Sequence, residues 1–248
     1  MGSAVAKKMA EEDFDLILIS RTQEKLDKIK SDIIDLHPSV KITTVVLNIL
    51  DDTEVKNFTK KLKRKDTTFH YVHSSGLSSG NYKVKNDNPY LSVEATGEDL
   101  VMLEFEIIVK SLLLMMKHLL PIFEKQKETR VVVINSMSGI RPFPFGFSHS
   151  AAKGGLHNAV RSLCLELNPK NIRVSEVNPG IVDTGFYDNK EIEKAIISIC
   201  KTFGYDLKSI PKMPPSAVAS AVKLCLTEDS HFLSINMVAP GQIPNLGA

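Results

Sequence analysis

Short apolar runs alternate along the chain with stretches in which apolar residues recur every three or four positions. The runs predict strands at residues 16–19, 42–47, 68–72, 131–134, 172–177 and 234–238. The periodic stretches predict helices at residues 3–12, 22–36, 51–62, 101–120, 153–167, 191–200 and 216–226. Because strands and helices take turns, we expect a three-layer α/β/α fold with a mostly parallel sheet.

Local signals set several boundaries of these elements. The strand at Leu16–Ile19 is apolar at every position, so we expect it to be buried on both faces. Asp51, with Glu54 three residues later, resembles a helix-start capping box. Pro121 should end or bend the long helix before it. The polar stretch at 78–97 is expected to pass over the surface.

Composition favours one soluble, cytoplasmic domain. The 248 residues are 43% hydrophobic, enough for one sizeable core, so we expect residues 1–248 to form a single domain. The balance of 31 basic and 29 acidic residues does not favour nucleic acid or membrane as a partner. The three cysteines lack metal-ligand spacing, and no secretion signal is present, so we expect no metal site and a reducing compartment.

The candidate chemistry lies in two neighbouring segments, Val131–Gly139 (VVVINSMSG) and Ser148–Lys153 (SHSAAK). Their spacing resembles the short-chain dehydrogenases/reductases, in which a serine past the fifth strand is followed thirteen residues later by a tyrosine and then, one helical turn on, by a lysine. Ser136 and Lys153 match this pattern, and His149 stands in the tyrosine position. Residues four apart on a helix share a face, so 149 and 153 can meet one ligand together.

The resemblance implies a role for each of these residues. In the family the serine holds the substrate oxygen, the tyrosine exchanges the proton, and the lysine binds the nicotinamide ribose. By resemblance, Ser136, His149 and Lys153 would be catalytic, and Lys153 would also bind the cofactor. An ordinary strand end followed by a helix start is the structural alternative for these segments.

Other segments that match the family predict cofactor contacts. Asn178–Thr184 (NPGIVDT) resembles the Pro-Gly segment whose backbone and threonine contact the nicotinamide and pyrophosphate, which implicates Pro179, Gly180 and Thr184. Gly76 is the retained glycine of the run that normally lines the adenine-ribose site. Asn48 stands where an aspartate usually caps the adenine.

Arg21 indicates which dinucleotide is bound. It follows the strand at 16–19, where a dinucleotide fold reads the adenosine ribose. A carboxylate there would bind a 2′-hydroxyl, whereas the arginine fork suits a 2′-phosphate, so NADP is favoured over NAD. A solvated arginine at the start of a helix is the alternative.

The chain departs from the family in three further places. The first strand and most of the glycine-rich turn of this Rossmann-like fold are missing, and Gly2 looks like the last glycine of that turn. The missing strand would lie in mid-sheet, so two strand edges should lack ladder partners; a mis-assigned start or a truncated chain would explain this.

His149 replaces the reactive tyrosine. We expect the neighbouring Lys153 ammonium to keep the imidazole mostly neutral. Ile108 aligns with the asparagine that holds a relay water.

Two functions compete for this sequence. The preferred hypothesis is an NADP-dependent oxidoreductase that interconverts a carbonyl and an alcohol on a small-molecule substrate. The alternative is a catalytically impaired relative that acts as a dinucleotide-binding or scaffold protein; a fragment that binds nothing is a third possibility.

The substrate lid should be formed by residues 181–215, which include Phe186, Tyr187, Ile196 and Ile197. Phe143, Phe145 and Phe147 either line the substrate pocket or pack in the core. The helices around Ile108 and Leu156 should form homodimer or homotetramer faces.

Overall fold

The computed structural model describes residues 1–62, 67–76, 92–185, 188, 190–202, 204 and 208–242, without the side chains of 191, 192 and 195. The helices are α1 (Gly2–Glu11), α2 (Gln23–Ile34), α3 (Asp52–Lys60), α4 (Glu98–Phe105), α5 (Ser111–Phe123), α6 (Phe147–Leu167), α7 (Lys190–Thr202) and α8 (Pro215–Thr227). The strands are β1 (Leu16–Ser20), β2 (Ile42–Val46), β3 (Tyr71–His73), β4 (Thr129–Ile134), β5 (Ile172–Pro179) and β6 (Ser234–Met237). Shorter helical segments are η1 (Val93–Ala95), η2 (Glu106–Lys110), η3 (Met137–Gly139) and η4 (Asn168–Lys170).

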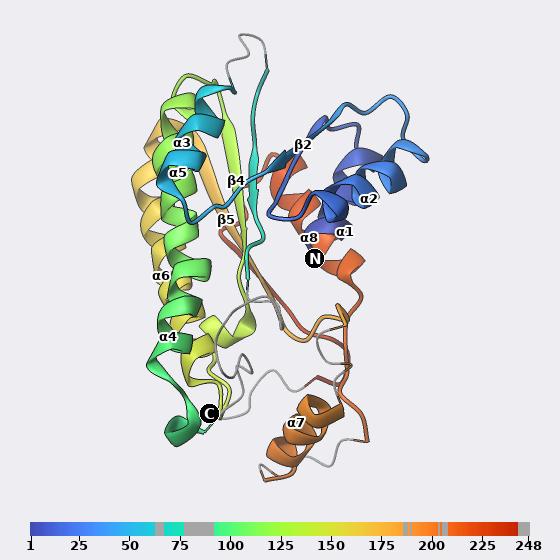
Figure 1. Ribbon diagram of the computed structural model, residues 1–248, viewed down its shortest axis with the longest axis vertical. Helices are drawn as coiled ribbons and strands as arrows, with labels where there is room; N and C mark the ends of the chain where they lie inside the picture. Colours follow the sequence, from blue (N-terminus) through green and yellow to red (C-terminus); the bar gives the residue numbers. More distant parts are fainter. Residues whose placement is uncertain are drawn as a thin grey trace.

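The predicted three-layer α/β architecture is confirmed. All strand pairs are parallel, and β4 lies between β3 and β5 with every residue buried. Because side chains alternate across a strand, Val131 and Val133 pack with α5 and α6, whereas Val132 and Ile134 pack with α1 and α8. Figure 1 shows these two groups of helices on opposite faces of the strands.

The sheet of the described residues is divided into two parts. One part has the order β1-β2 and the other the order β3-β4-β5-β6, so β1 and β3 each pair on one side only. This break lies between β1 and β3, and the expectation that a first strand is missing there stays a prediction. The prediction that the strand at 16–19 is buried on both faces is wrong, because Ile17 is 37% exposed. Among the described residues β1 pairs with β2 alone.

The long central helix does not end at Pro121. It runs from α4 through one π-helical turn, η2, into α5, and Pro121 lies inside α5. Proline near a helix end removes a single backbone bond, and Phe123, only 1% exposed, anchors the final turn in the core. The irregularity is instead the π turn at 106–110, a feature that is frequent at functional sites.

Other boundaries differ by a few residues. The strand expected at 68–72 is reduced to β3, while Asn178 and Pro179, expected in a loop, belong to β5. The Asp51 cap is confirmed, because its Oδ1 accepts from Glu54 N at 2.9 Å. Of the polar stretch expected on the surface at 78–97, residues 78–91 lie outside the described residues.

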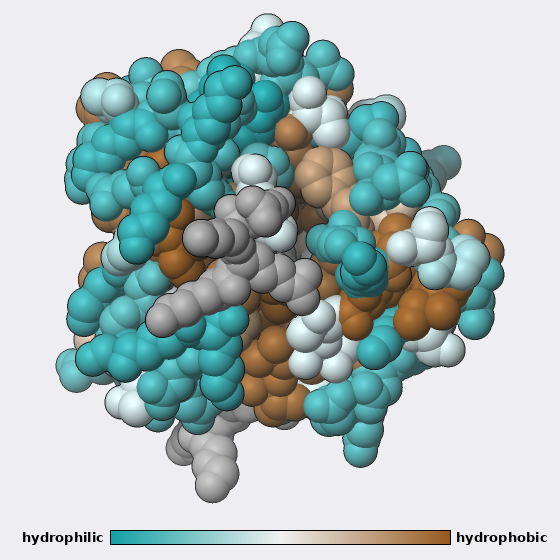
Figure 2. Space-filling model, turned by 90° about the horizontal axis from the view of Figure 1, so that it is seen from above, coloured by the Kyte–Doolittle hydropathy of each residue, from teal (hydrophilic) through white to brown (hydrophobic). Residues whose placement is uncertain are grey.

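The surface of the described chain is mainly polar. Seen from above, hydrophilic side chains cover most of the molecule, and apolar patches lie between them (Figure 2). None of the described helices combines the length and the apolar character that a membrane crossing requires.

Candidate active site

The centre of the site is the junction between the end of β4 and helix α6. Asn135, the residue after β4, donates from Nδ2 to the backbone oxygen of Lys153 at 3.1 Å, and Lys153 Nζ donates back to the backbone oxygen of Asn135 at 3.4 Å. Gly139 lies so close that a Cβ there would be 2.5 Å from the same Lys153 oxygen. These contacts hold the segment with Ser136 directly against the helix that carries Lys153.

Lys153 is a buried cation. Its exposed fraction is 5%, and its burial lowers the pKa of the ammonium to about 8, although Glu104 and Glu176 oppose this shift. An ammonium has three donors, and within the described residues the Asn135 oxygen is its one acceptor. The side chain therefore keeps donors for a ligand.

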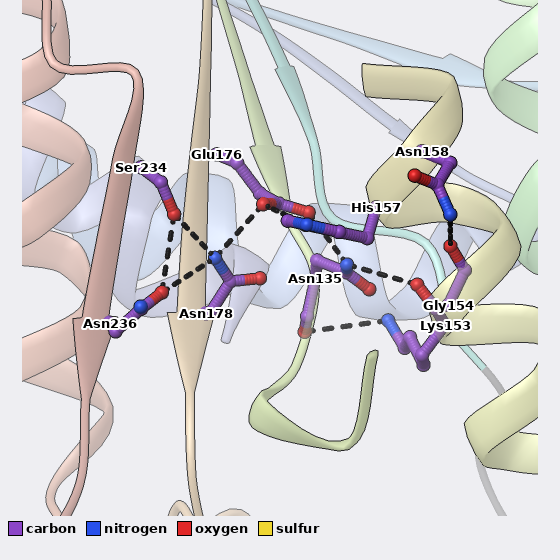
Figure 3. A network of polar contacts seen from close by, with 9 residues as sticks. All are labelled: Asn135, Lys153, Gly154, His157, Asn158, Glu176, Asn178, Ser234 and Asn236. Atoms are coloured by element: carbon purple, nitrogen blue, oxygen red, sulfur yellow. Dashed lines mark hydrogen bonds and ion pairs between the residues drawn. The ribbon is translucent and has the colours of Figure 1, made fainter. Parts of the chain in front are cut away.

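A network of polar side chains lies beneath the junction (Figure 3). Glu176, on β5, is 1% exposed and accepts hydrogen bonds from Asn135 Nδ2 at 2.7 Å, His157 Nδ1 at 2.8 Å and Asn178 Nδ2 at 3.0 Å. Asn178 Nδ2 is shared further with the side chains of Ser234 and Asn236 on β6. This network ties three neighbouring strands and α6 together below the site, so it fixes the position of Asn135.

His149 lies one helical turn before Lys153 and is held by a carboxylate. Its Nδ1 is 3.1 Å from Oε1 of Glu104, on α4. The imidazole is 22% exposed, whereas the Glu104 side chain is fully buried. The sequence suggested only a lysine beside this histidine, so the carboxylate is a new element of the site.

Ser136 caps the short η3 turn. Its Oγ accepts from Ser138 N at 3.1 Å, which leaves the hydroxyl proton without an acceptor among the described residues. Ser136, His149 and Lys153 therefore lie on two segments that pack together, and each keeps unused hydrogen-bonding capacity.

Four predicted cofactor residues lie at the ends of strands or at the start of α1. Gly2 opens α1, and a Cβ there would lie 2.9 Å from Ser74 Oγ, so this helix begins at the carboxyl end of β3. Arg21, after β1, and Asn48, after β2, are both exposed. Gly76 is exposed, with open space where a Cβ would stand.

The segment after β5 has a structural neighbour that the sequence did not reveal. Pro179 is buried in β5, Thr184 is exposed, and a Cβ on Gly180 would lie 2.5 Å from the carboxamide of Gln242. Gln242 Oε1 accepts from Ile181 N at 3.0 Å and from Ala239 N at 3.2 Å. The close approach of Gln242 is therefore one physical reason for a glycine at 180.

His73, on β3, is buried, with an exposed fraction of 1%. Its Nδ1 pairs with the Tyr71 hydroxyl at 2.7 Å and its Nε2 lies 3.3 Å from Ser111 Oγ. Ser111 Oγ also donates to the Ile107 backbone oxygen in the π turn, at 2.5 Å. Burial, with a smaller effect of Lys153, lowers the pKa of His73 to about 3, so the ring is neutral.

The segment expected to form the lid contains a small apolar cluster. Ile196 and Cys200 of α7 form a small buried cluster with Ile210, against which Phe143 and Ile181 pack. Phe145 and Phe147 are half exposed, so of the three phenylalanines Phe143 is the one that joins this cluster. Phe186 and Tyr187 lie outside the described residues.

Two residues that the sequence analysis missed, Glu104 and Glu176, carried a usable signal. Each is an acidic side chain within a segment expected to be buried, the long central helix (VMLEFEII) or the strand at 172–177, where a charge is costly unless it has partners. The partners, His149 and His157, lie 45 and 19 residues away, so only the fold identifies them. Within the described residues, no group of three or more His, Cys, Asp or Glu side chains could hold a metal ion.

Known proteins share this architecture. The sequence pattern described as short chain dehydrogenase matches residues 1–195. An uncharacterized oxidoreductase of Staphylococcus epidermidis is 24% identical over 238 residues, which cover 96% of this chain and 90% of that protein. Dehydrogenase/reductase SDR family member 4 of Mus musculus is 26% identical over 247 residues, which cover 97% and 82%.

A solved structure gives the same fold. The NADPH-bound short chain oxidoreductase from Pseudomonas aeruginosa, described as containing an atypical catalytic center, superimposes with a TM-score of 0.79 at 20% identity, covering 96% of this chain and 90% of the other. The chain thus belongs to the short-chain dehydrogenase family, a class of oxidoreductases.

Proposed function

We propose that the protein is an NADP-dependent oxidoreductase that interconverts a carbonyl compound and an alcohol. The observation that supports the proposal is the junction at which Lys153 and Asn135 exchange two hydrogen bonds. Ser136 follows Asn135 directly, and His149 precedes Lys153 by one turn of α6. The Ser136 hydroxyl and the His149 imidazole can hydrogen-bond to the oxygen of a carbonyl or alcohol. The Lys153 ammonium has unused donors that can bind a ribose.

The residues present fit a pyridine dinucleotide. Lys153 has donors for ribose hydroxyls, and the start of α1 at Gly2 presents backbone amides at the carboxyl end of the strands, where anions bind. The open space at Gly76 allows a close approach to the backbone. Arg21 would bind a 2′-phosphate, Asn48 would contact the base, and Pro179, Gly180 and Thr184 would border the nicotinamide end. When bound, the reduced nucleotide supplies a hydride.

The chain's own side chains would then manage the substrate oxygen. Ser136 would donate a hydrogen bond to that oxygen, and His149 would hold or release its proton. Lys153, kept cationic by Glu104 and Glu176 against the effect of burial, would stabilise negative charge on the oxygen and orient the ribose. The α7 lid would exclude water from this group.

The test is turnover of a panel of aldehydes and ketones with NADPH, followed by the loss of nucleotide absorbance. Wild type should reduce at least one compound, while Ser136→Ala and Lys153→Met should lose most of the rate. Lys170→Met is the matched control, because Lys170 is exposed and pairs with Glu124 away from the site. If wild type is silent and His149→Tyr reduces substrates, the protein is instead a dinucleotide-binding scaffold with an impaired catalytic centre.

We also propose a homodimer or homotetramer in the cytoplasm. Ile108 and Leu156 are fully buried within the chain, so they cannot be interface residues themselves. The outer faces of the same central helices, however, expose Met102, Leu113 and Leu165. Light scattering on wild type and on Leu113→Glu would test the assembly, and the free thiols in the described chain suit a reducing compartment.

A further inference from the structure

Glu104 is placed in a way that packing alone does not explain. It lies near the end of α4, between Leu103 and Phe105 in the sequence, with its side chain fully buried. Oε1 is 3.1 Å from His149 Nδ1, whereas Oε2 is buried without a hydrogen-bond partner in the described part of the chain. Removing a carboxylate from water is costly unless hydrogen bonds or an opposite charge compensate for the lost hydration.

The contact determines which nitrogen of His149 carries a proton. An ionised carboxylate only accepts hydrogen bonds, so Nδ1 donates in this contact when Glu104 is ionised. Nε2, on the other side of the ring, has no partner among the described residues, and the ring is partly exposed. A buried carboxylate that orients a histidine in this way leaves the second nitrogen for proton exchange.

We propose that Glu104 is a positioning residue that holds His149 with Nδ1–H on its carboxylate, so that Nε2 exchanges the proton in place of a tyrosine hydroxyl. This inference rests on the proposed function for its chemistry. It replaces the expectation that Lys153 alone sets the state of His149.

The surrounding charges suit this assignment. Glu104 from α4 and Glu176 from β5 both act on Lys153 of α6, and the neutral His73 of β3 lies on the same side. Besides Lys153, Glu176 has a partner in His157, whose Nδ1 lies 2.8 Å from Oε2. His149 is the corresponding imidazole partner of Glu104.

The proton balance is simple. In reduction, the carbonyl carbon gains a hydride from the reduced pyridine nucleotide, and the carbonyl oxygen takes the proton from Nε2 as the N–H bond breaks. His149 passes from imidazolium to neutral imidazole, because its Nδ1 proton stays on the ring and remains hydrogen-bonded to Glu104. Oxidation of the alcohol runs the same transfers in reverse.

The first test needs no turnover. Nitrogen NMR of histidine-labelled protein, with His149 assigned by loss of its signals in His149→Gln, reports which ring nitrogen is protonated. Wild type should show the Nδ1–H form at alkaline pH, and Glu104→Gln should shift the population toward Nε2–H. An Nε2–H ring in wild type would overturn the proposal, and this measurement stands even if Glu104→Gln does not fold.

The second test uses the rate at neutral pH. Glu104→Gln should lower kcat by about tenfold or more in the His149 protein and by less than about twofold in the His149→Tyr protein, since tyrosine does not use the carboxylate in this way. Equal losses in both backgrounds would make Glu104 a structural residue and overturn the proposal. If no variant turns over any substrate, the proposed function fails, and the NMR result alone decides the role of Glu104.

Discussion

The side chains of Lys153 and Asn135 each donate a hydrogen bond to the backbone oxygen of the other residue. Asn135 Nδ2 donates to the Lys153 oxygen, and Lys153 Nζ donates to the Asn135 oxygen at 3.4 Å. This reciprocal pair joins the end of β4 to α6. Because Ser136 follows Asn135 directly, the pair also holds the segment that carries Ser136 against α6. The predictions below concern the charges and contacts around this pair.

Lys153 should reduce stability at neutral pH. Burial lowers its pKa from 10.5 to about 8, so the folded chain holds this proton less tightly than the unfolded chain does. The unfolded state therefore binds more protons between these two values, and the free energy of unfolding rises with pH across that range. Lys153→Met should raise the free energy of unfolding at pH 7 by up to about 3 kcal/mol.

Urea denaturation at several pH values checks this prediction. The gain of Lys153→Met over wild type should shrink from pH 8 upward and vanish above pH 10.5, where lysine is neutral in both states. A variant that is less stable than wild type at pH 7 would show that Lys153 instead contributes to folding.

His73 should make the fold sensitive to acid. Its pKa falls from 6.5 to about 3 on burial, so below pH 6.5 the unfolded chain takes up a proton that the folded chain refuses. The free energy of unfolding should therefore drop by about 1.4 kcal/mol per pH unit from this group as the pH falls toward 3. In His73→Leu this part of the slope should disappear, even though the Tyr71 hydroxyl loses its partner and total stability falls. An unchanged slope would contradict the prediction.

His157 and Glu176 should be energetically coupled. His157→Leu leaves a carboxylate that is only 1% exposed without its imidazole partner, which should cost about 3 kcal/mol of unfolding free energy. Adding Glu176→Leu should recover much of this loss, because Asn135 and Asn178 both keep other acceptors. A double-mutant cycle by urea denaturation measures the coupling, and strict additivity would argue against it.

The two parts of the sheet should differ in local stability. β1 pairs on one side and is half exposed, whereas β4 pairs on both sides and is fully buried. Amide hydrogen exchange should therefore be faster in β1 and β2 than in β4 and β5. Equal protection in the two parts would mean that they unfold as one unit.

Arg21 should select the 2′-phosphate. Arg21→Glu should weaken NADPH binding by about tenfold or more while NADH binding changes little, because only NADPH carries the phosphate that the guanidinium fork fits. Lys28→Glu, at an exposed position on α2, controls for net charge. Equal weakening for both nucleotides would remove the case for NADP.

The sequence was most informative where the determinants are local. Val131–Ile134 is apolar at every position and forms a fully buried strand, and the spacing between 149 and 153 is one helical turn of α6. The contacts of Glu104 and Glu176 join residues far apart in the chain, so periodicity could not find them. The half-exposed β1 and the helix that continues past Pro121 depend on which neighbours are present, a property of the tertiary structure.

The most direct test of the account is titration of the protein with NADPH, followed by nucleotide fluorescence. Wild type should bind, Lys170→Met should bind equally well, and Lys153→Met should bind about tenfold more weakly or worse, although it folds more stably. A wild type that does not bind NADPH, or a Lys153→Met protein that binds it as tightly, would contradict the central claim that Lys153 and Ser136 form one nucleotide-dependent site.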